Sequence, residues 1–237
     1  MRALLAVCKR QTMGLWQDGM MMAMIPVPFL AVFAINQGIP YLNEILVRQF
    51  GKMNLLQPYY LIFDLLMVAV VPIMLCSVYS MSLLTEFDDK VANYLVITPV
   101  GVKGYLAASL LIPSIVGSII SILLIRFFSL TSFTIIELVV FFLFGLTLSL
   151  ICSLLILGMS HNKVEGVAYS KFTSIFILGF PAPFFLSSPL QYVASILPSF
   201  WVTKYLIEDV PGYLLGFVFT TILWLIVLFR KFYQKLQ

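Results

Sequence analysis

Side chains that could do chemistry are few in this sequence of 237 residues, and they lie far apart. The single histidine, His161, stands in a polar stretch, and the three cysteines are scattered without a partner at metal-ligand or disulfide spacing. The chain has no GxxxxGKS or GxxxxGKT phosphate loop, no HExxH helix and no GxSxG turn. We therefore predict no catalytic residue, no metal site and no bound cofactor in this chain.

Asp64 is the charged residue that lies deepest in an apolar stretch. It stands about five residues inside that stretch, which is roughly 8 Å at 1.5 Å per helical residue. Charges inside a bilayer are costly and often mark a transport route, so Asp64 is a candidate for a substrate pathway. The alternative is an interfacial aspartate that pairs locally. Arg126 and Glu137 flank a short loop, where we expect an ordinary ion pair.

The elements that carry these residues have the composition of a membrane protein. The chain is 62% hydrophobic and 10% charged, whereas soluble domains are roughly half apolar and a quarter charged. A membrane-spanning helix needs about 20 apolar residues. The stretches that qualify are 19–38, 59–84, 105–128, 133–159, 172–190 and 212–229. We predict an all-α integral membrane protein with about six spans, which form a single transmembrane domain over residues 1–237.

The fifth predicted span is interrupted by prolines, which remove helix hydrogen bonds. Pro181, Pro183 and Pro189 would end this helix partway through the membrane. Residues 190–207 are also apolar but contain Pro198, which favours a re-entrant hairpin or an interfacial helix between the fifth and sixth spans.

The basic residues orient the spans. Cytoplasmic loops are rich in Lys and Arg, and an N-terminus inside the cell leaves only Arg48, Lys52, Arg126 and Lys204 of the 14 basic residues outside. Both termini are therefore predicted to be cytoplasmic. The longest stretches between spans are about 20 residues, too short for an autonomous domain of about 50, so we predict no nucleotide-binding domain here.

The loop after the second span has the pattern of a short helix. Thr85 is a plausible N-cap, and Phe87, Val91 and Tyr94 fall on one helical face before Pro99. This helix could offer its face to a cytoplasmic subunit. Alternatively, it is a solvated loop or an amphipathic helix that rests on lipid.

Three segments carry a resemblance to a known family. The run TEFDDKVANYLVITPVGVKGYL, from Thr85, resembles the loop between the second and third spans of type-2 ABC exporter permeases. The run NKVEG, from Asn162, together with Lys171, is similar to a loop of the permease subgroup named for fluoroquinolone export. The run LPSFWVTK, from Leu197, and the prolines Pro26 and Pro28 agree with that subgroup as well.

The resemblance implies a non-catalytic permease of a prokaryotic plasma membrane. Such a permease pairs with a second permease subunit, the same or related, and with cytoplasmic ABC ATPases that bind ATP and Mg²⁺, and it exports a hydrophobic or amphipathic drug, antibiotic or peptide. The residues implied in ATPase coupling are Glu86, Phe87, Asp88, Asp89, Val91, Tyr94, Asn162, Lys163, Glu165 and Gly166. The residues implied in an outer-gate hairpin are Phe180, Pro181, Pro183, Pro198, Trp201 and Lys204.

Other functions remain open from the residues alone. An ion-coupled carrier or an accessory membrane protein would need no ATPase, but carriers usually show internal repeats and charged midplane residues, and only Asp64 approaches this. A polytopic membrane enzyme would need converging catalytic groups. Small residues at four-residue spacing, such as Ser114 and Ser118, predict close helix packing, either within the chain or at a subunit interface.

Overall fold

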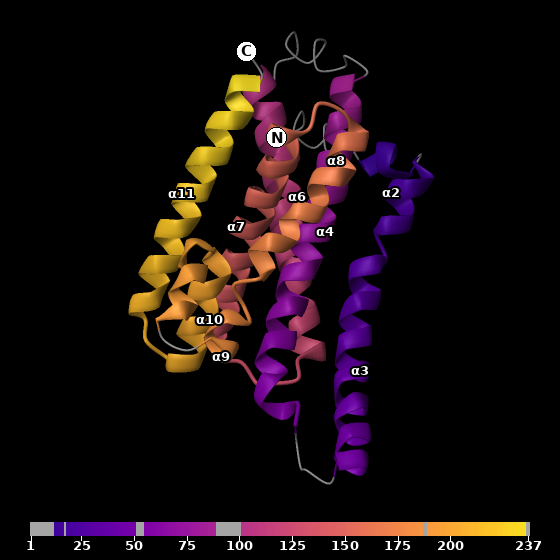
Figure 1. The fold of residues 1–237 in the computed structure, drawn as a ribbon. Helices are drawn as coiled ribbons and strands as arrows, with labels where there is room; N and C mark the ends of the chain where they lie inside the picture. Colours follow the sequence, from indigo (N-terminus) through magenta and orange to yellow (C-terminus); the bar gives the residue numbers. More distant parts are fainter. Residues whose placement is uncertain (1–11, 17, 51–54, 89–100, 187–188, 236–237) are drawn as a thin grey trace.

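The computed structural model describes residues 12–16, 18–50, 55–88, 101–186 and 189–235, without the side chains of 50, 88 and 101–108 (Figure 1). The regular elements in this part of the chain are helices. Five helical stretches are long and apolar enough to cross a membrane. They contain α2 and α3 (Gly19–Met24 and Val27–Phe50), α4 (Tyr60–Asp88), α6 (Gly101–Phe128), α7 (Ile135–Met159) and α11 (Gly212–Lys235).

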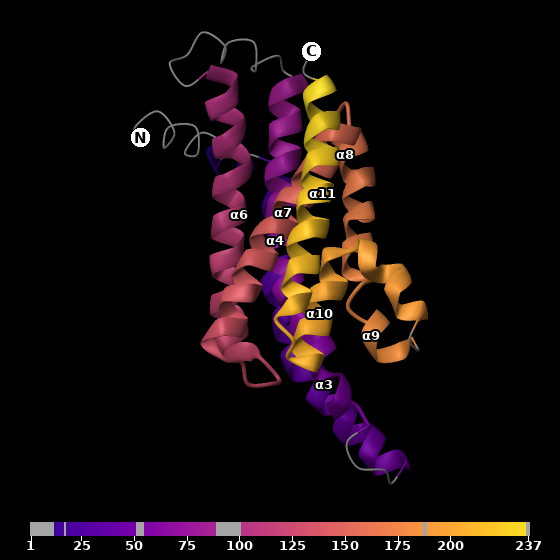
Figure 2. The same cartoon turned by 90° about the vertical axis from the view of Figure 1, so that its left-hand side faces the viewer.

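The long helices form a bundle around α4 and α7. Helix α4 packs against α6 and α7, and α7 also packs against α11. Helices α4 and α7 are largely buried, whereas α3 and α11 expose most of their surface. Figure 2 shows that the lower part of α3 projects away from the other helices. The core therefore lies between α4, α6 and α7, and α3 and α11 cover its edges.

Proline inside a long helix leaves a carbonyl without its usual donor, and α4 shows how this carbonyl is satisfied. Pro72 cannot donate to the carbonyl of Val68, four residues earlier. Ser121 of α6 donates its hydroxyl to that carbonyl at 2.8 Å. A polar residue of the third span thus replaces the missing bond of the second, which ties the two helices together.

Small residues allow the three central helices to approach closely. A Cβ atom on Gly117 would lie 3.1 Å from the Cα of Pro72, and one on Gly145 would lie 3.2 Å from Oγ of Ser118. Ser114 and Ser118 are fully buried, and each hydroxyl donates to the carbonyl four residues earlier in α6. These small residues pack within the chain, which is one of the two alternatives that their spacing left open.

Between α7 and α11 the chain forms a series of short helices instead of one span. They are α8 (Lys163–Ser170), the 3-10 helix η2 (Lys171–Ile177), α9 (Ala182–Phe185), the 3-10 helix η3 (Leu190–Ile196) and α10 (Pro198–Glu208). Figures 1 and 2 show that α8 begins near the end of the bundle where α11 finishes, and that α9 and α10 lie in the opposite half. We call the first end the α8 end and the opposite one the far end.

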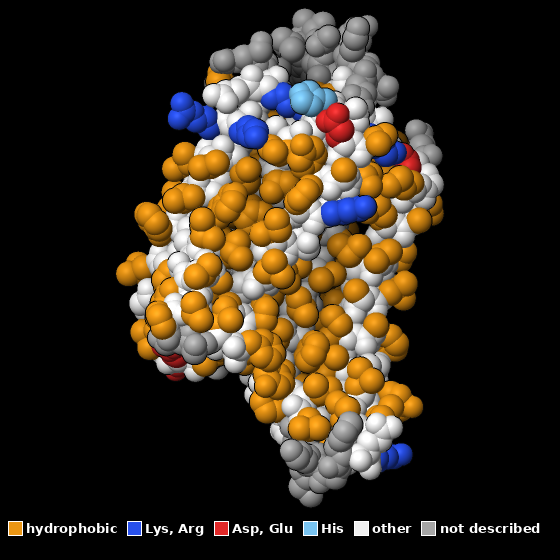
Figure 3. All heavy atoms as spheres, in the orientation of Figure 1, with side chains coloured by type: hydrophobic (Ala, Val, Ile, Leu, Met, Phe, Trp, Pro, Cys, Tyr) orange, Lys and Arg blue, Asp and Glu red, His pale blue; other side chains and the backbone are white. Residues whose placement is uncertain are grey.

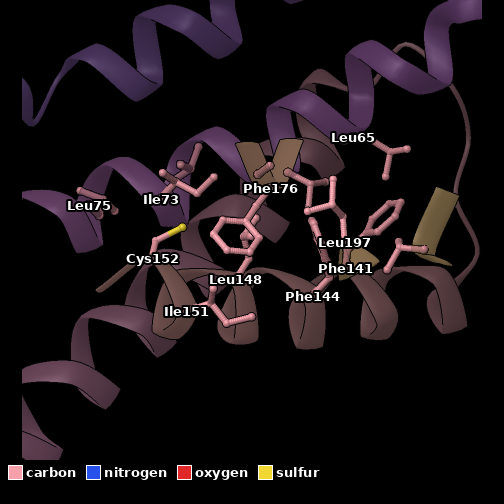
Figure 4. Packing of buried hydrophobic residues seen from close by; sticks show 14 of the residues in the cluster. Leu65, Ile73, Leu75, Phe141, Phe144, Leu148, Ile151, Cys152, Phe176 and Leu197 are labelled. Carbon is pink, nitrogen blue, oxygen red and sulfur yellow. The ribbon is translucent and has the colours of Figure 1, made fainter. Parts of the chain in front are cut away.

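The short helices belong to the same hydrophobic core as the long ones. Phe176 of η2 and Leu197, just before α10, point toward α4 and α7, among side chains such as Leu148 and Phe144 (Figure 4). Phe180 is fully buried and its ring meets the ring of Phe144 edge-on, with centroids 5.6 Å apart. The segment from α8 to α10 is therefore part of the bundle and not a peripheral loop.

The predicted spans agree with the helices except at the fifth span and at the end of the first. The stretch 172–190 is not one of the five long apolar helices, because η2 ends at Ile177 and a turn follows before α9. The first span is also longer than predicted: the helix continues through Gly38 and Pro40 to Phe50. Gly38 faces open space, so its missing side chain costs no packing contact. Figure 3 shows apolar side chains along the length of the bundle, with most visible Lys and Arg near the α8 end.

Candidate functional site

The second predicted coupling segment forms the first turn of α8. Asn162 caps this helix, because its side-chain oxygen accepts a hydrogen bond from the Glu165 backbone N–H at 2.9 Å. The Glu165 carboxylate in turn accepts from the backbone N–H of His161 at 2.7 Å. This bond, assisted by the nearby His161 ring, lowers the pKa of Glu165 below its usual value. The polar sequence around residue 162 is therefore a capped helix start that carries one basic residue, Lys163, and one acidic residue, Glu165.

Gly166 brings this helix start against the end of α4. A Cβ atom there would lie 2.6 Å from the Cδ1 of Leu84, so a larger residue would force either the Leu84 side chain or α8 to move. The structure thus places Asn162–Gly166 beside the last turns of α4, which carry Glu86, Phe87 and Asp88. The three other predicted coupling residues of this loop, Asp89, Val91 and Tyr94, lie outside the described residues.

The loop helix does not begin where the sequence predicted. We expected Thr85 to be the N-cap of a separate helix, but Thr85 lies inside α4 and donates its hydroxyl to the Met81 carbonyl at 3.1 Å. The apolar run of α4 simply continues as helix through Phe87, which packs against the main core. A threonine inside a helix can donate its hydroxyl to a carbonyl of the same helix, so a threonine alone does not mark a helix start.

An ion pair fastens the N-terminal segment to α8. Asp18 caps α2 by accepting from the N–H of Met20, and its carboxylate also pairs with Lys163. The bond from Lys163 lowers the pKa of Asp18. Next to this pair, Leu15 and Met21 are buried against Val78 and Met81 of α4 in a small apolar cluster. The start of the first span therefore moves together with α8 and α4.

The end of α11 joins the same group of elements. Lys235 donates to the carbonyl of Leu157 at 2.9 Å and also to that of Ser160, at the end of α7. A cation at these free carbonyls offsets the negative end of the helix. The α8 end thus unites the ends of α4, α7 and α11 with the starts of α2 and α8.

The predicted outer-gate hairpin lies in the far half of the bundle. Its turn is tight: a Cβ atom on Gly179 would lie 2.2 Å from Oγ of Ser199, so only glycine lets the turn approach α10. Pro181 precedes α9, Pro183 lies inside it and Pro198 starts α10, which are positions where proline loses no helix bond. Trp201 lies over Gly216 of α11, whose Cβ would be 2.5 Å from the indole ring.

Lys204 is the centre of a polar cluster inside this hairpin. It is only 5% exposed, and its ammonium group pairs with Glu208 at 2.8 Å and contacts Oε1 of Gln191 at 3.4 Å. The rings of Tyr192 and Tyr213 lie around the ammonium, with centroids at 5.1 and 5.5 Å. This cluster joins η3, α10 and α11.

Asp64 of the second span has hydrogen-bond partners in the loop between α6 and α7. It is fully buried, and its carboxylate accepts from the backbone N–H of Leu130 at 2.8 Å and from both the N–H and the hydroxyl of Thr131, at 2.9 and 2.6 Å. These contacts hold the loop between α6 and α7 at the far end. They match the local-pairing alternative for Asp64.

Instead of the expected ion pair with Arg126, Glu137 caps the start of its own helix. Glu137 accepts from the N–H and hydroxyl of Thr134, at 2.6 and 2.8 Å, and the Thr134 hydroxyl accepts from the Glu137 N–H. This reciprocal capping box starts α7. The spacing of Thr134 and Glu137 is the signal that could have predicted it.

Sequence reasoning missed several residues that the fold brings into these clusters. Asp18 precedes an apolar run, which is the pattern of a helix N-cap, but its partner Lys163 is 145 positions away. Glu208 could have been found from its spacing of four residues after Lys204 on one helix. Gln191, Tyr192 and Tyr213 reach Lys204 only through the hairpin, so no local pattern indicates them.

Comparison with known proteins gives the family. The family described as "Fluoroquinolones export permease protein Rv2686c-like" matches residues 11–229. Two relatives from Mycobacterium tuberculosis are similar over nearly the whole chain: "Fluoroquinolones export permease protein Rv2686c" of strain H37Rv and "Fluoroquinolones export permease protein MT2760" of strain CDC 1551. Each is 25% identical over 260 residues, which cover 99% of this chain and 95% of the relative. No solved structure matches. The chain belongs to this export permease family and is a multi-pass membrane protein of a prokaryote.

Proposed function

We propose that this export permease is the membrane subunit of an ATP-driven exporter that moves a hydrophobic or amphipathic compound out of the cell. Separate cytoplasmic ABC ATPases would bind and hydrolyse ATP with Mg²⁺, and a second permease subunit, the same or related, would complete the complex. The relatives are named for fluoroquinolone export, so a fluoroquinolone is the first compound to test.

The observation that carries this proposal is the meeting of the end of α4 with the start of α8 at the α8 end. Gly166 of α8 and Leu84 of α4 come into direct contact, so the Asn162–Gly166 turn and the last turn of α4 form one surface. Lys235 and the Asp18–Lys163 pair bind α11 and α2 to this surface. A protein that pushes on these loops would therefore act on four helices at once.

The placement of the elements supports six crossings in total, with both termini inside. The chain passes between the two ends along α3, α4, α6 and α7, and α11 begins at the far end and finishes at the α8 end (Figure 1). The segment 163–211 must therefore return the chain to the far end. We take this return as the fifth crossing, with the far end as the outer exit and the stretch Phe180–Lys204 as its hairpin.

Charge reversal at Glu86 and Asp89 tests the coupling role. We expect the doubly substituted protein, Glu86→Lys and Asp89→Lys, to insert and purify normally but to capture much less of a co-expressed ATPase, because opposite charges would meet the partner surface. The measurement is the amount of ATPase that co-purifies with the tagged permease.

Glu44→Lys is the matched control, because Glu44 is exposed near the far end of α3. It should leave ATPase capture unchanged. Full capture by the Glu86/Asp89 variant would argue against the coupling role. Export that persists in membranes without any ATPase would favour an ion-coupled carrier instead.

A further inference from the structure

Lys204 is unusual because it is a cation inside the apolar bundle. Of the charged side chains that the structure describes, Asp64 and Lys204 are the buried ones. A charged side chain is stable inside a protein only when partner groups replace the water that it loses on burial. Asp64 has these partners in one loop, whereas Lys204 has them on its own helix α10 and on two other helices, η3 and α11. The Lys204 contacts therefore bind elements that could otherwise move apart.

The helix that depends most on these contacts is η3. Its outward side chains Leu190, Val193 and Ile196 are exposed, and its polar attachments to α10 and α11 are made by side-chain donors. Near its C-terminal end, Trp201 donates its indole N–H to the Ser195 carbonyl at 2.7 Å, and Trp224 donates to the Ile196 carbonyl at 2.8 Å. Its N-terminal half is held by Lys204, through Gln191 and the Tyr192 ring, and by the edge of that ring against Phe200, with centroids 5.7 Å apart.

These two attachments differ in strength. The indole bonds are short, and each occupies a backbone carbonyl. The contacts from Lys204 to η3 are a 3.4 Å hydrogen bond and a ring at 5.1 Å. If η3 moves away, Lys204 keeps its 2.8 Å ion pair with Glu208 and its contact with Tyr213, so no bare charge is left in the apolar interior. Release of the N-terminal half of η3 therefore breaks one long hydrogen bond and the ring contacts of Tyr192, whereas release of the C-terminal half breaks both indole bonds.

We propose that Lys204 is the latch of η3. It holds the N-terminal half of this helix closed over α10 and α11, while Trp201 and Trp224 anchor the C-terminal half, about which η3 opens. Lys204 is a positioning residue: it sets the population of the closed hairpin. This role rests on the proposed function only in taking the far end as the exit for the exported compound.

Thiol labelling measures the opening in the purified protein without ATPase or substrate, so its failure is separate from a failure of the proposed function. Gln191→Cys places a probe at the latched half of η3, where the native side chain is 8% exposed. This change removes the hydrogen bond from Lys204 to Gln191, so the part of the latch that the probe tests is the contact of Lys204 with the Tyr192 ring. The labelling rate with a charged maleimide is followed by peptide mass spectrometry. Cys76 and Cys152 are buried in the core and report unfolding in the same sample.

We expect Lys204→Met to raise the labelling rate of the introduced thiol about fivefold, the factor that a cation–ring contact of roughly 1 kcal/mol contributes. Lys204→Arg keeps the cation and should restore the slow rate in large part. Lys171→Met makes the same change at an exposed lysine of η2 and should have no effect.

An unchanged rate in Lys204→Met, with both core cysteines protected, would overturn the proposal. Rapid labelling already in the Lys204 protein would overturn it as well, because η3 would then not be closed. If Lys204→Met exposes Cys152, the gentler Tyr192→Leu decides: it removes the η3 ring from the cation and leaves an apolar side chain against Phe200. The latch requires faster labelling in this variant, and an unchanged rate excludes it.

Discussion

Asp64 shows at the residue scale how a buried charge can be structural. All three hydrogen bonds to its carboxylate come from Leu130 and Thr131, so both oxygens are occupied by the loop between α6 and α7. A carboxylate that serves a transported compound needs an oxygen free to face it. The contacts therefore favour a clasp that holds the far ends of α4, α6 and α7 in register.

Asp64→Asn tests the clasp. Asparagine keeps one acceptor but brings an NH₂ group toward backbone N–H donors, so we expect a loss of about 1–3 kcal/mol in stability and a lower melting temperature in detergent. Thr131→Val removes one of the same bonds, and its effect should not add fully to that of Asp64→Asn. Loss of export with an unchanged melting temperature would instead support the substrate-pathway hypothesis.

At the scale of elements, the long apolar helices could be predicted from the sequence, whereas their ends could not. Hydropathy identified the regions of α3, α4, α6, α7 and α11 because lipid demands about 20 apolar residues in each. The helix ends depend on caps and on tertiary contacts, so α3 runs past Pro40 and α4 runs past Thr85. These continuations follow from packing that no short window contains.

The segment between α7 and α11 illustrates the same limit at the candidate site. Its prolines predicted a broken helix, and the structure has η2, α9 and η3 there. Its contacts could not be predicted, because Lys204 meets side chains 12, 13 and 9 positions away, on two other helices. Composition therefore indicated where the hairpin lies, and only the fold shows what holds it together.

The contact of α10 with α11 depends on Gly216. Its Cβ position is filled by the Trp201 indole, at 2.5–2.8 Å, whereas a Cβ on Gly212 would meet its nearest neighbour, Val210, at 3.7 Å. We expect Gly216→Ala to push Trp201 aside and lower stability by about 1–3 kcal/mol, the usual cost of overpacking. The matched Gly212→Ala change should be close to neutral. Thermal unfolding in detergent compares the two, and equal melting temperatures would contradict this packing.

At the scale of the whole molecule, the two ends of the bundle differ in charge and in construction. The α8 end collects Lys163 and Lys235 in helix-capping and ion-pairing roles, and most of the visible basic side chains lie there (Figure 3). The far end holds the Asp64 clasp and the Lys204 cluster, in which each buried charge is satisfied inside the protein. Basic residues favour the cytoplasmic side of a membrane, which supports our proposal that the α8 end is the inner one.

This orientation gives a single test of the fifth crossing. His161 has a side chain that is 79% exposed at the α8 end, and Val210 is 45% exposed just before α11. In intact cells, a membrane-impermeant thiol reagent should label Val210→Cys directly and His161→Cys only after permeabilisation. The two positions bracket the segment from α8 to α10, so labelling on opposite sides requires this broken segment to carry the chain across. Labelling of both positions from the same side would mean that α8, η2 and α10 enter and leave the membrane by one face, which would contradict the fifth crossing.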